Sequence, residues 1–226
     1  MKIDFHTHYS KEHFNSLCER ARKLGLDGLV MEGIPFQESF SFNSLVIFPA
    51  QEVQWIAAMH TSVYATHADY YTKKQSGENT DVYRGKALVI LPLKTYKKLQ
   101  DDSLFDLFKT VHDLNGIVIA LQDNSTNRIT SEGTIGNLYQ FDAVRIRPFN
   151  EHDLKYEITS ANFTVAGSDA TKASELTYGK GFTELEFDVT STEQLIDYIK
   201  NNYPTKLYVH TEKGMMDIKE TTGERK

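Results

Sequence analysis

The sequence predicts an α/β protein whose strands close into a barrel related to the TIM architecture. Short apolar runs that are typical of buried strands alternate along the chain with amphipathic stretches of helical period. This alternation indicates parallel β-α units, and seven or more strand candidates fall within roughly the first 210 residues. Their number favours a barrel over an open sheet, although the pattern alone fits both. We therefore expect a single barrel domain over residues 1–210 and a polar C-terminal tail over 211–226.

The strand candidates are short runs of apolar and β-branched residues. In order along the chain, they cover residues 2–6, 26–31, 45–49, 60–66, 87–91, 117–121, 143–146 and 163–166. Residues 70–84 are polar and have no clear period, which predicts a loop or lid.

Three helices are expected because apolar residues recur at helical spacing. They cover residues 11–24, 104–114 and 192–201. Ser10, Ser103 and Ser191 each precede one of these stretches, where a side-chain oxygen caps free backbone N–H groups. Gly25 follows the first stretch and is a candidate helix stop.

The composition excludes several classes of protein. Hydrophobic residues make up 40% and charged residues 25% of the 226 residues, as in an ordinary globular domain. The formal net charge of -6 disfavours a basic surface, so we expect neither nucleic acid nor an anionic membrane as a partner. Cys18 is the single cysteine, which excludes an internal disulfide and a cysteine-based zinc cage.

The start of the chain is polar and lacks the apolar core of a signal peptide. No apolar run approaches the length of a membrane span. These two observations predict a cytoplasmic protein, and they leave its oligomeric state open.

The strongest local signal is the motif Asp4-x-His6-x-His8 on the first predicted strand. Alternation places positions 4, 6 and 8 on one face, with the two imidazoles about 6–7 Å apart. Such a pair converges on a metal at the carboxyl end of the strand, where sites lie in parallel α/β folds. Asp4 is then expected to orient one of the imidazoles without binding the metal itself. The alternative is a pair of partly buried histidines with ordinary hydrogen-bond partners.

Further residues of metal-ligand type lie at the ends of other predicted strands. Glu52 follows the strand at 45–49, His60 opens the next strand, and Asp169 follows the strand at 163–166 within Gly-Ser-Asp. Each has an ordinary interpretation by itself, as a solvated acid, a core histidine or a turn residue. Together they favour a carboxylate–imidazole site for zinc, manganese or iron(II).

The order of these motifs is similar to that of the PHP (polymerase and histidinol phosphatase) domain. Two motifs carry the resemblance, the opening Asp4-Phe5-His6-Thr7-His8 and the step Gly167-Ser168-Asp169-Ala170. Weaker matches follow in the family's order at residues 25–31, 48–53, 111–121, 141–145 and 182–187. The resemblance implies a metal-dependent phosphoesterase on a distorted (β/α)7 TIM-like barrel.

The resemblance also implies which metal ligands remain. The set for one metal is kept in full, as His6, His8, Glu52 and Asp169. A second metal shares the glutamate and adds two histidines, for which only His60 fits, with Gln122 or Asp123 as substitutes and His67 as an alternative to His60. The third metal's histidines are replaced by Gly33 and Thr171. We therefore expect one or two divalent ions.

The predicted function is hydrolysis of a small-molecule phosphoester, as a phosphatase or phosphodiesterase, by a metal-activated water. Asp169 is expected to be both ligand and general base, with Asp123 as a second candidate base. Arg145, together with Arg147, is expected to offset charge on the phosphoryl oxygens. The alternative, favoured by the lost histidines, is a non-catalytic PHP-like barrel that binds a ligand or partner.

Overall fold

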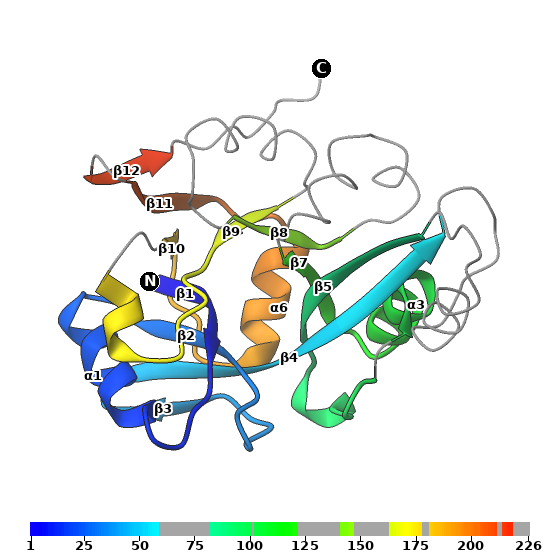
Figure 1. The fold of residues 1–226 in the computed structure, drawn as a ribbon, viewed down its shortest axis with the longest axis horizontal. Coiled ribbons are helices and arrows are strands. Elements are labelled where there is room, and N and C mark those ends of the chain that lie inside the picture. The colour runs from blue at the N-terminus through cyan, green and yellow to red at the C-terminus, as the bar shows by residue number, and fades with distance from the viewer. Residues whose placement is uncertain are drawn as a thin grey trace.

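The computed structural model describes residues 1–58, 82–100, 102–121, 141–146, 163–177, 181–211 and 214–218. Within these ranges the strands belong to one mixed sheet with the order β12-β11-β10-β1-β2-β4-β5-β7-β8-β9, and β3 and β6 pair with β4 (Figure 1). The strands are β1 (Lys2–His8), β2 (Gly28–Glu32), β3 (Phe40–Phe42), β4 (Leu45–Ala58), β5 (Val82–Ile90), β6 (Asp102–Ser103), β7 (Ile117–Leu121), β8 (Ala143–Ile146), β9 (Thr164–Ala166), β10 (Phe182–Leu185), β11 (Thr205–Thr211) and β12 (Gly214–Ile218).

The sheet is nearly closed. An isolated parallel bridge between Thr7 and Ala170 joins β1 to the segment that follows β9. The series of paired strands β1-β2-β4-β5-β7-β8-β9 therefore returns to its own start, which supports the expectation of a barrel. Its type differs from the prediction, because β4 pairs antiparallel with β5, β5 with β7, and β1 with β10. A regular (β/α)7 barrel would have parallel pairs throughout.

The largest departure from the predicted strands lies in β4 and β5. Both are longer than expected, and they form an antiparallel ladder from Gln51 opposite Val89 to Ala58 opposite Val82. Residues 82–84, which were expected in the loop at 70–84, therefore belong to β5. The strand expected at 60–66 lies outside the described residues.

The C-terminal segment also differs from the expected tail. Residues 214–218 form β12, which pairs antiparallel with β11. A tail was expected because this segment has no apolar helical face. A strand that pairs with its neighbour through backbone hydrogen bonds does not need such a face. The boundary at residue 210 remains a prediction.

The three predicted helices are present as α1 (Phe14–Lys23), α3 (Leu104–Asp113) and α6 (Thr192–Lys200), and short 3-10 helices η1 and η2 cover Leu93–Thr95 and Ala173–Thr177. Ser103 and Ser191 cap α3 and α6 through their side chains, as expected. Helix α1 begins three residues late, and there Ser10 accepts hydrogen bonds through its backbone carbonyl instead. Gly25 ends α1 with a φ of 77°.

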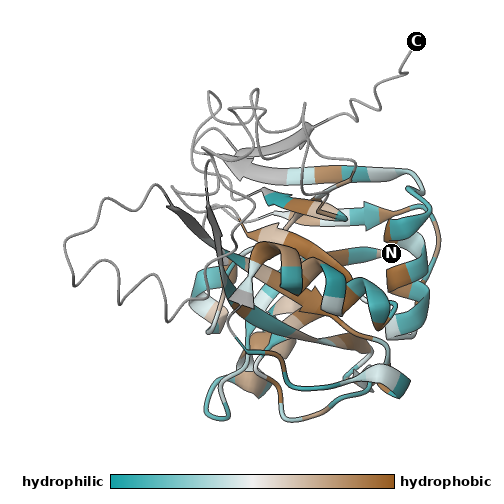
Figure 2. Cartoon of the chain, turned by 90° about the vertical axis from the view of Figure 1, so that its right-hand side faces the viewer, coloured by the Kyte–Doolittle hydropathy of each residue, from teal (hydrophilic) through white to brown (hydrophobic). Residues whose placement is uncertain are grey.

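The buried apolar residues of the described ranges form three clusters. The central one joins inward-facing strand residues such as Phe5, Phe48 and Leu88 to the buried face of α6, which projects inside the ring of strands in the view of Figure 1. A second packs α3 against β4, β5 and β7, and a third packs α1 against β2 and β4. Figure 2 shows apolar residues concentrated on the central strands, with hydrophilic residues along the outer surfaces.

Within the described part of the chain, no helix is both long enough and apolar enough to cross a membrane.

Phe48→Ala tests whether the interior of the sheet is the main source of stability. Phe48 is fully buried, so the cavity left by its ring should lower the free energy of unfolding by about 3–5 kcal/mol. Phe36→Ala is the matched control, because Phe36 is 55% exposed and its loss should change stability by less than about 1 kcal/mol. Urea denaturation followed by the fluorescence of Trp55 measures both, and equal losses would contradict the assigned core.

Candidate metal centre

The two histidines of β1 lie side by side. Their ring centroids are 4.6 Å apart, His6 is almost fully buried, and the His8 side chain is about a quarter exposed. The pairing of β1 with β2 shifts between Asp4 and Thr7, so strict alternation does not run through the strand. The predicted convergence of the two rings holds, but the shift separates Asp4 from them.

Asp4 contacts the backbone rather than an imidazole. Its carboxylate oxygen Oδ1 accepts hydrogen bonds from the backbone N–H groups of Ser168, at 2.8 Å, and His6, at 3.1 Å. Burial raises the pKa of Asp4 to about 6 against these hydrogen bonds, which lower it. The carboxylate thus ties the turn after β9 to β1, in place of the expected contact with a ring nitrogen.

Asp169 reaches the histidines because that turn lies directly against β1. The N–H of Asp169 donates to the carbonyl of His6 at 2.7 Å, and the N–H of His8 donates to the carbonyl of Ala170 at 2.9 Å. Gly167 permits this approach, since a Cβ there would lie 2.6 Å from the His6 backbone nitrogen. Asp169 itself has a φ of 65°, a left-handed conformation that aspartate tolerates better than most residues.

Three potential ligand atoms converge at this point. The Oδ1 atom of Asp169 lies 3.0 Å from both His6 Nδ1 and His8 Nε2, and one ligand atom from each residue falls within 4.8 Å of the others. The contact with His6 lacks the alignment of a hydrogen bond, so neither ring nitrogen of His6 has a hydrogen-bond partner among the described residues. A buried imidazole with free ring nitrogens beside a carboxylate fits a divalent ion.

The protonation states of the two histidines differ. Burial lowers the pKa of His6 to about 4, which leaves its imidazole neutral and able to coordinate. Hydrogen bonds to Asp169 and Glu32 raise the pKa of His8 to about 9. The close contacts of Asp169 with His6 and His8 strongly lower its pKa. An ion that binds His8 therefore replaces a proton.

Glu32 was not among the residues predicted from the sequence. Its Oε2 atom lies 3.0 Å from His8 Nδ1, and the interaction with His8 lowers the pKa of Glu32. This contact fixes which nitrogen of His8 faces Asp169. Its position at the carboxyl end of β2, opposite His8 in the parallel ladder, is the signal that could have found it.

Glu52 lies at the border of the cluster. Its Oε2 atom is 3.8 Å from His6 Nε2, and its Oε1 atom forms a 2.6 Å ion pair with Lys86 Nζ. Lys86, from β5, is a second residue that the sequence analysis did not identify. Arg145, which was expected near the site, is 2% exposed and places Nη1 3.6 Å from Asp169 Oδ1.

The structure therefore brings together five of the predicted site residues, His6, His8, Glu52, Arg145 and Asp169. Their roles as ligands, base or anion-binding group remain predictions. The other candidates lie outside the described residues, namely His60, His67, Gln122, Asp123 and Arg147.

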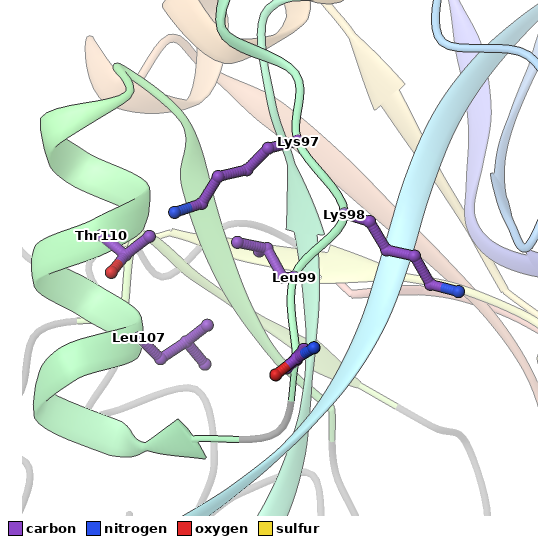
Figure 3. Close-up of a pocket in the computed structure, with 6 residues that line it drawn as sticks. Lys97, Lys98, Leu99, Leu107 and Thr110 are labelled. Atoms are coloured by element: carbon purple, nitrogen blue, oxygen red, sulfur yellow. The ribbon is translucent and has the colours of Figure 1, made fainter.

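A hollow of about 270 Å³ lies elsewhere, between residues 97–100 and α3 (Figure 3). The side chain of Gln51 supports its rim, through hydrogen bonds with the carbonyl of Lys97 and the N–H of Leu99. Because adjacent residues of a strand point to opposite faces, this hollow lies across the sheet from Glu52. It is not part of the cluster.

No family model and no curated protein matches the chain. Among solved structures, the chain is similar to the lesion-specific endonuclease PfuEndoQ from Pyrococcus furiosus, with a TM-score of 0.57 and 14% identity over 91% of this chain and 57% of that one. It is also similar to Endonuclease Q, solved in complex with a 27-mer duplex substrate that has an abasic lesion at the active site. Here the TM-score is 0.54, and the identity is 12% over 90% of this chain and 57% of that chain. The chain spans a little over half the length of these proteins, and the likeness shows a shared fold.

The sequence-based exclusion of nucleic acid is wrong. A protein of the same fold has been solved with a duplex at its active site, so the fold does not exclude such a partner. Net charge sums the whole surface, whereas binding depends on the local field. In this acidic chain, Lys86 and Arg145 both lie at the candidate centre.

The raised pKa of His8 predicts an alkaline loss of stability in the metal-free protein. The contribution of protonated His8 to the free energy of unfolding is fully present below pH 6.5 and is lost as the pH rises through about 9. The difference in unfolding free energy between wild type and His8→Gln should therefore shrink by up to about 3 kcal/mol over that range. Urea denaturation in EDTA at several pH values measures it, and a pH-independent difference would contradict the ion pairing.

Gly167→Ala tests whether the contact between the turn and β1 holds the ligands in place. The new Cβ must displace the turn, so we expect a loss of about 1–3 kcal/mol in stability and of about tenfold or more in Mn²⁺ affinity. The control Gly25→Ala is strained by its positive φ but meets no atom within 4 Å, and should bind Mn²⁺ normally. Calorimetric titration compares the two, and equal affinities would show that Gly167 does not position the site.

Proposed function

We propose that the protein is a metal-dependent phosphoesterase of the PHP family with a reduced metal centre. The observation that carries this proposal is the convergence of His6, His8 and Asp169 at the carboxyl end of β1. All three residues belong to the two motifs on which the family resemblance is strongest. The nearly closed sheet and the structural likeness to an endonuclease support the same proposal.

The donor set fits one divalent ion. Two imidazole nitrogens and a carboxylate oxygen are typical of zinc, manganese and iron(II) sites, with Glu52 as the nearest further carboxylate. A divalent ion held there would act as a Lewis acid and would lower the pKa of a coordinated water.

The protein's own groups divide the remaining tasks. Asp169 suits the role of ligand, because a carboxylate with so low a pKa accepts protons poorly. The predicted general base is therefore better sought in Asp123, the second candidate. Arg145 is buried next to Asp169 and cannot lose its charge, so it offers a fixed positive group to phosphoryl oxygens.

Two classes of substrate should be tested. The sequence predicts a small phosphorylated molecule, and the endonuclease fold adds phosphodiesters of duplex DNA. Both present a phosphoryl group to the same centre.

His6→Ala should abolish phosphoester hydrolysis, because it removes a buried ligand. We expect wild type with Mn²⁺ or Zn²⁺ to hydrolyse at least one member of a panel of phosphomonoesters, phosphodiesters and duplex DNA, and His6→Ala to lose at least a hundredfold of that rate. His112→Ala is the matched control, since His112 is an exposed histidine on α3 that contacts Asp142. Equal rates for wild type and His6→Ala across the panel would favour the non-catalytic, ligand-binding barrel.

A further inference from the structure

Lys86 lies at the mouth of the barrel, on the inward side of β5. It is two residues before Leu88 and four before Ile90, whose side chains belong to the central apolar cluster. Residues spaced by two on a strand share a face, so Lys86 continues this inward column toward the site. Its cross-strand partners are Gln54 on β4 and Leu121 on β7. The side chain is 46% exposed and is therefore accessible to a ligand.

The carboxylate of Glu52 is shared between two neighbours. Oε2 faces His6 Nε2 at 3.8 Å, and Oε1 is held by the Lys86 ammonium at 2.6 Å. Because the Glu52 side chain is only 17% exposed, water solvates its carboxylate incompletely, and the ion pair with Lys86 compensates its charge. An ammonium at Oε1 also occupies the position from which that oxygen would bind another cation.

Two cationic side chains flank the cluster. Lys86 reaches it from β5 through its ion pair with Glu52. Arg145 provides a second positive group at Asp169. Positively charged side chains from β5 and β8 therefore flank the cluster of His6, His8 and Asp169.

We propose that the Lys86 ammonium is the second cation of this centre, so that the site holds one divalent ion and uses Lys86 to bind the phosphoryl oxygens of the substrate. The inference rests on the proposed function. Lysine suits the role, because its ammonium is a compact point charge with three donors and can contact Glu52 and a phosphate together. A phosphoryl group that approaches the ion then meets Lys86, while the buried Arg145 adds positive charge from beside Asp169, and no second ion is needed to balance the charge of the phosphoryl group.

The test measures two affinities, of which only the affinity for phosphate should fall. In Lys86→Met, removal of a nearby positive charge should leave Mn²⁺ binding as tight as in wild type or several-fold tighter. The affinity of the Mn²⁺-loaded protein for inorganic phosphate should fall about tenfold or more. Calorimetric titration gives both constants, and electron paramagnetic resonance should show one uncoupled Mn²⁺ per wild-type chain.

Two variants serve as controls. Lys86→Arg keeps the charge and should retain phosphate affinity within a few-fold of wild type. Lys109→Met removes an equally charged lysine from the exposed Lys109–Asp113 pair on α3, and should change neither constant.

The outcomes separate this inference from the function on which it rests. If wild type binds no Mn²⁺, the metal centre itself is refuted, and this inference with it. If wild type binds two coupled ions, or if Lys86→Met weakens both ligands or neither, the role of Lys86 is refuted and the metal centre stands. A merely structural role for Lys86 would weaken Mn²⁺ and phosphate binding together.

Discussion

The geometry of the centre depends on the buried carboxylate of Asp4. Its hydrogen bonds with the backbone N–H groups of His6 and Ser168 join β1 to the turn after β9, and these two segments are far apart in sequence. Without this tie, the first and last strands of the barrel path would meet only through short backbone contacts around Thr7 and Ala170. The carboxylate offsets the cost of its burial by accepting hydrogen bonds from these two backbone amides. Asp169 is thereby placed against both histidines.

The motif Asp4-x-His6-x-His8 led to one expectation that the structure meets and one that it does not. Alternation along a strand predicts that His6 and His8 share a face, and they do. It also predicts that Asp4 joins them, which fails because the register shifts within β1. Irregularities of this kind depend on the neighbouring strand, so one strand's sequence does not reveal them.

Helices were predicted more accurately than sheet pairing. The spacing of apolar residues and the serine caps identify α3 and α6 within about one residue, because both signals are local. The antiparallel ladder between β4 and β5 depends on contacts between distant residues, and it places Lys86 near Glu52. Glu32 was missed for the same reason, since its role depends on its position opposite His8.

The charges around the two histidines have a consequence for how the centre is assembled. The carboxylates of Asp169, Glu32 and Glu52 already face a protonated imidazole, a guanidinium or an ammonium. The apoprotein is thus electrically satisfied, unlike small zinc domains that fold only around their ion. A divalent ion that bound there would displace the proton of His8, and the barrel would not have to fold around the ion. The occupancy of the centre would follow the supply of metal and the acidity of its surroundings, while the barrel persists through both states.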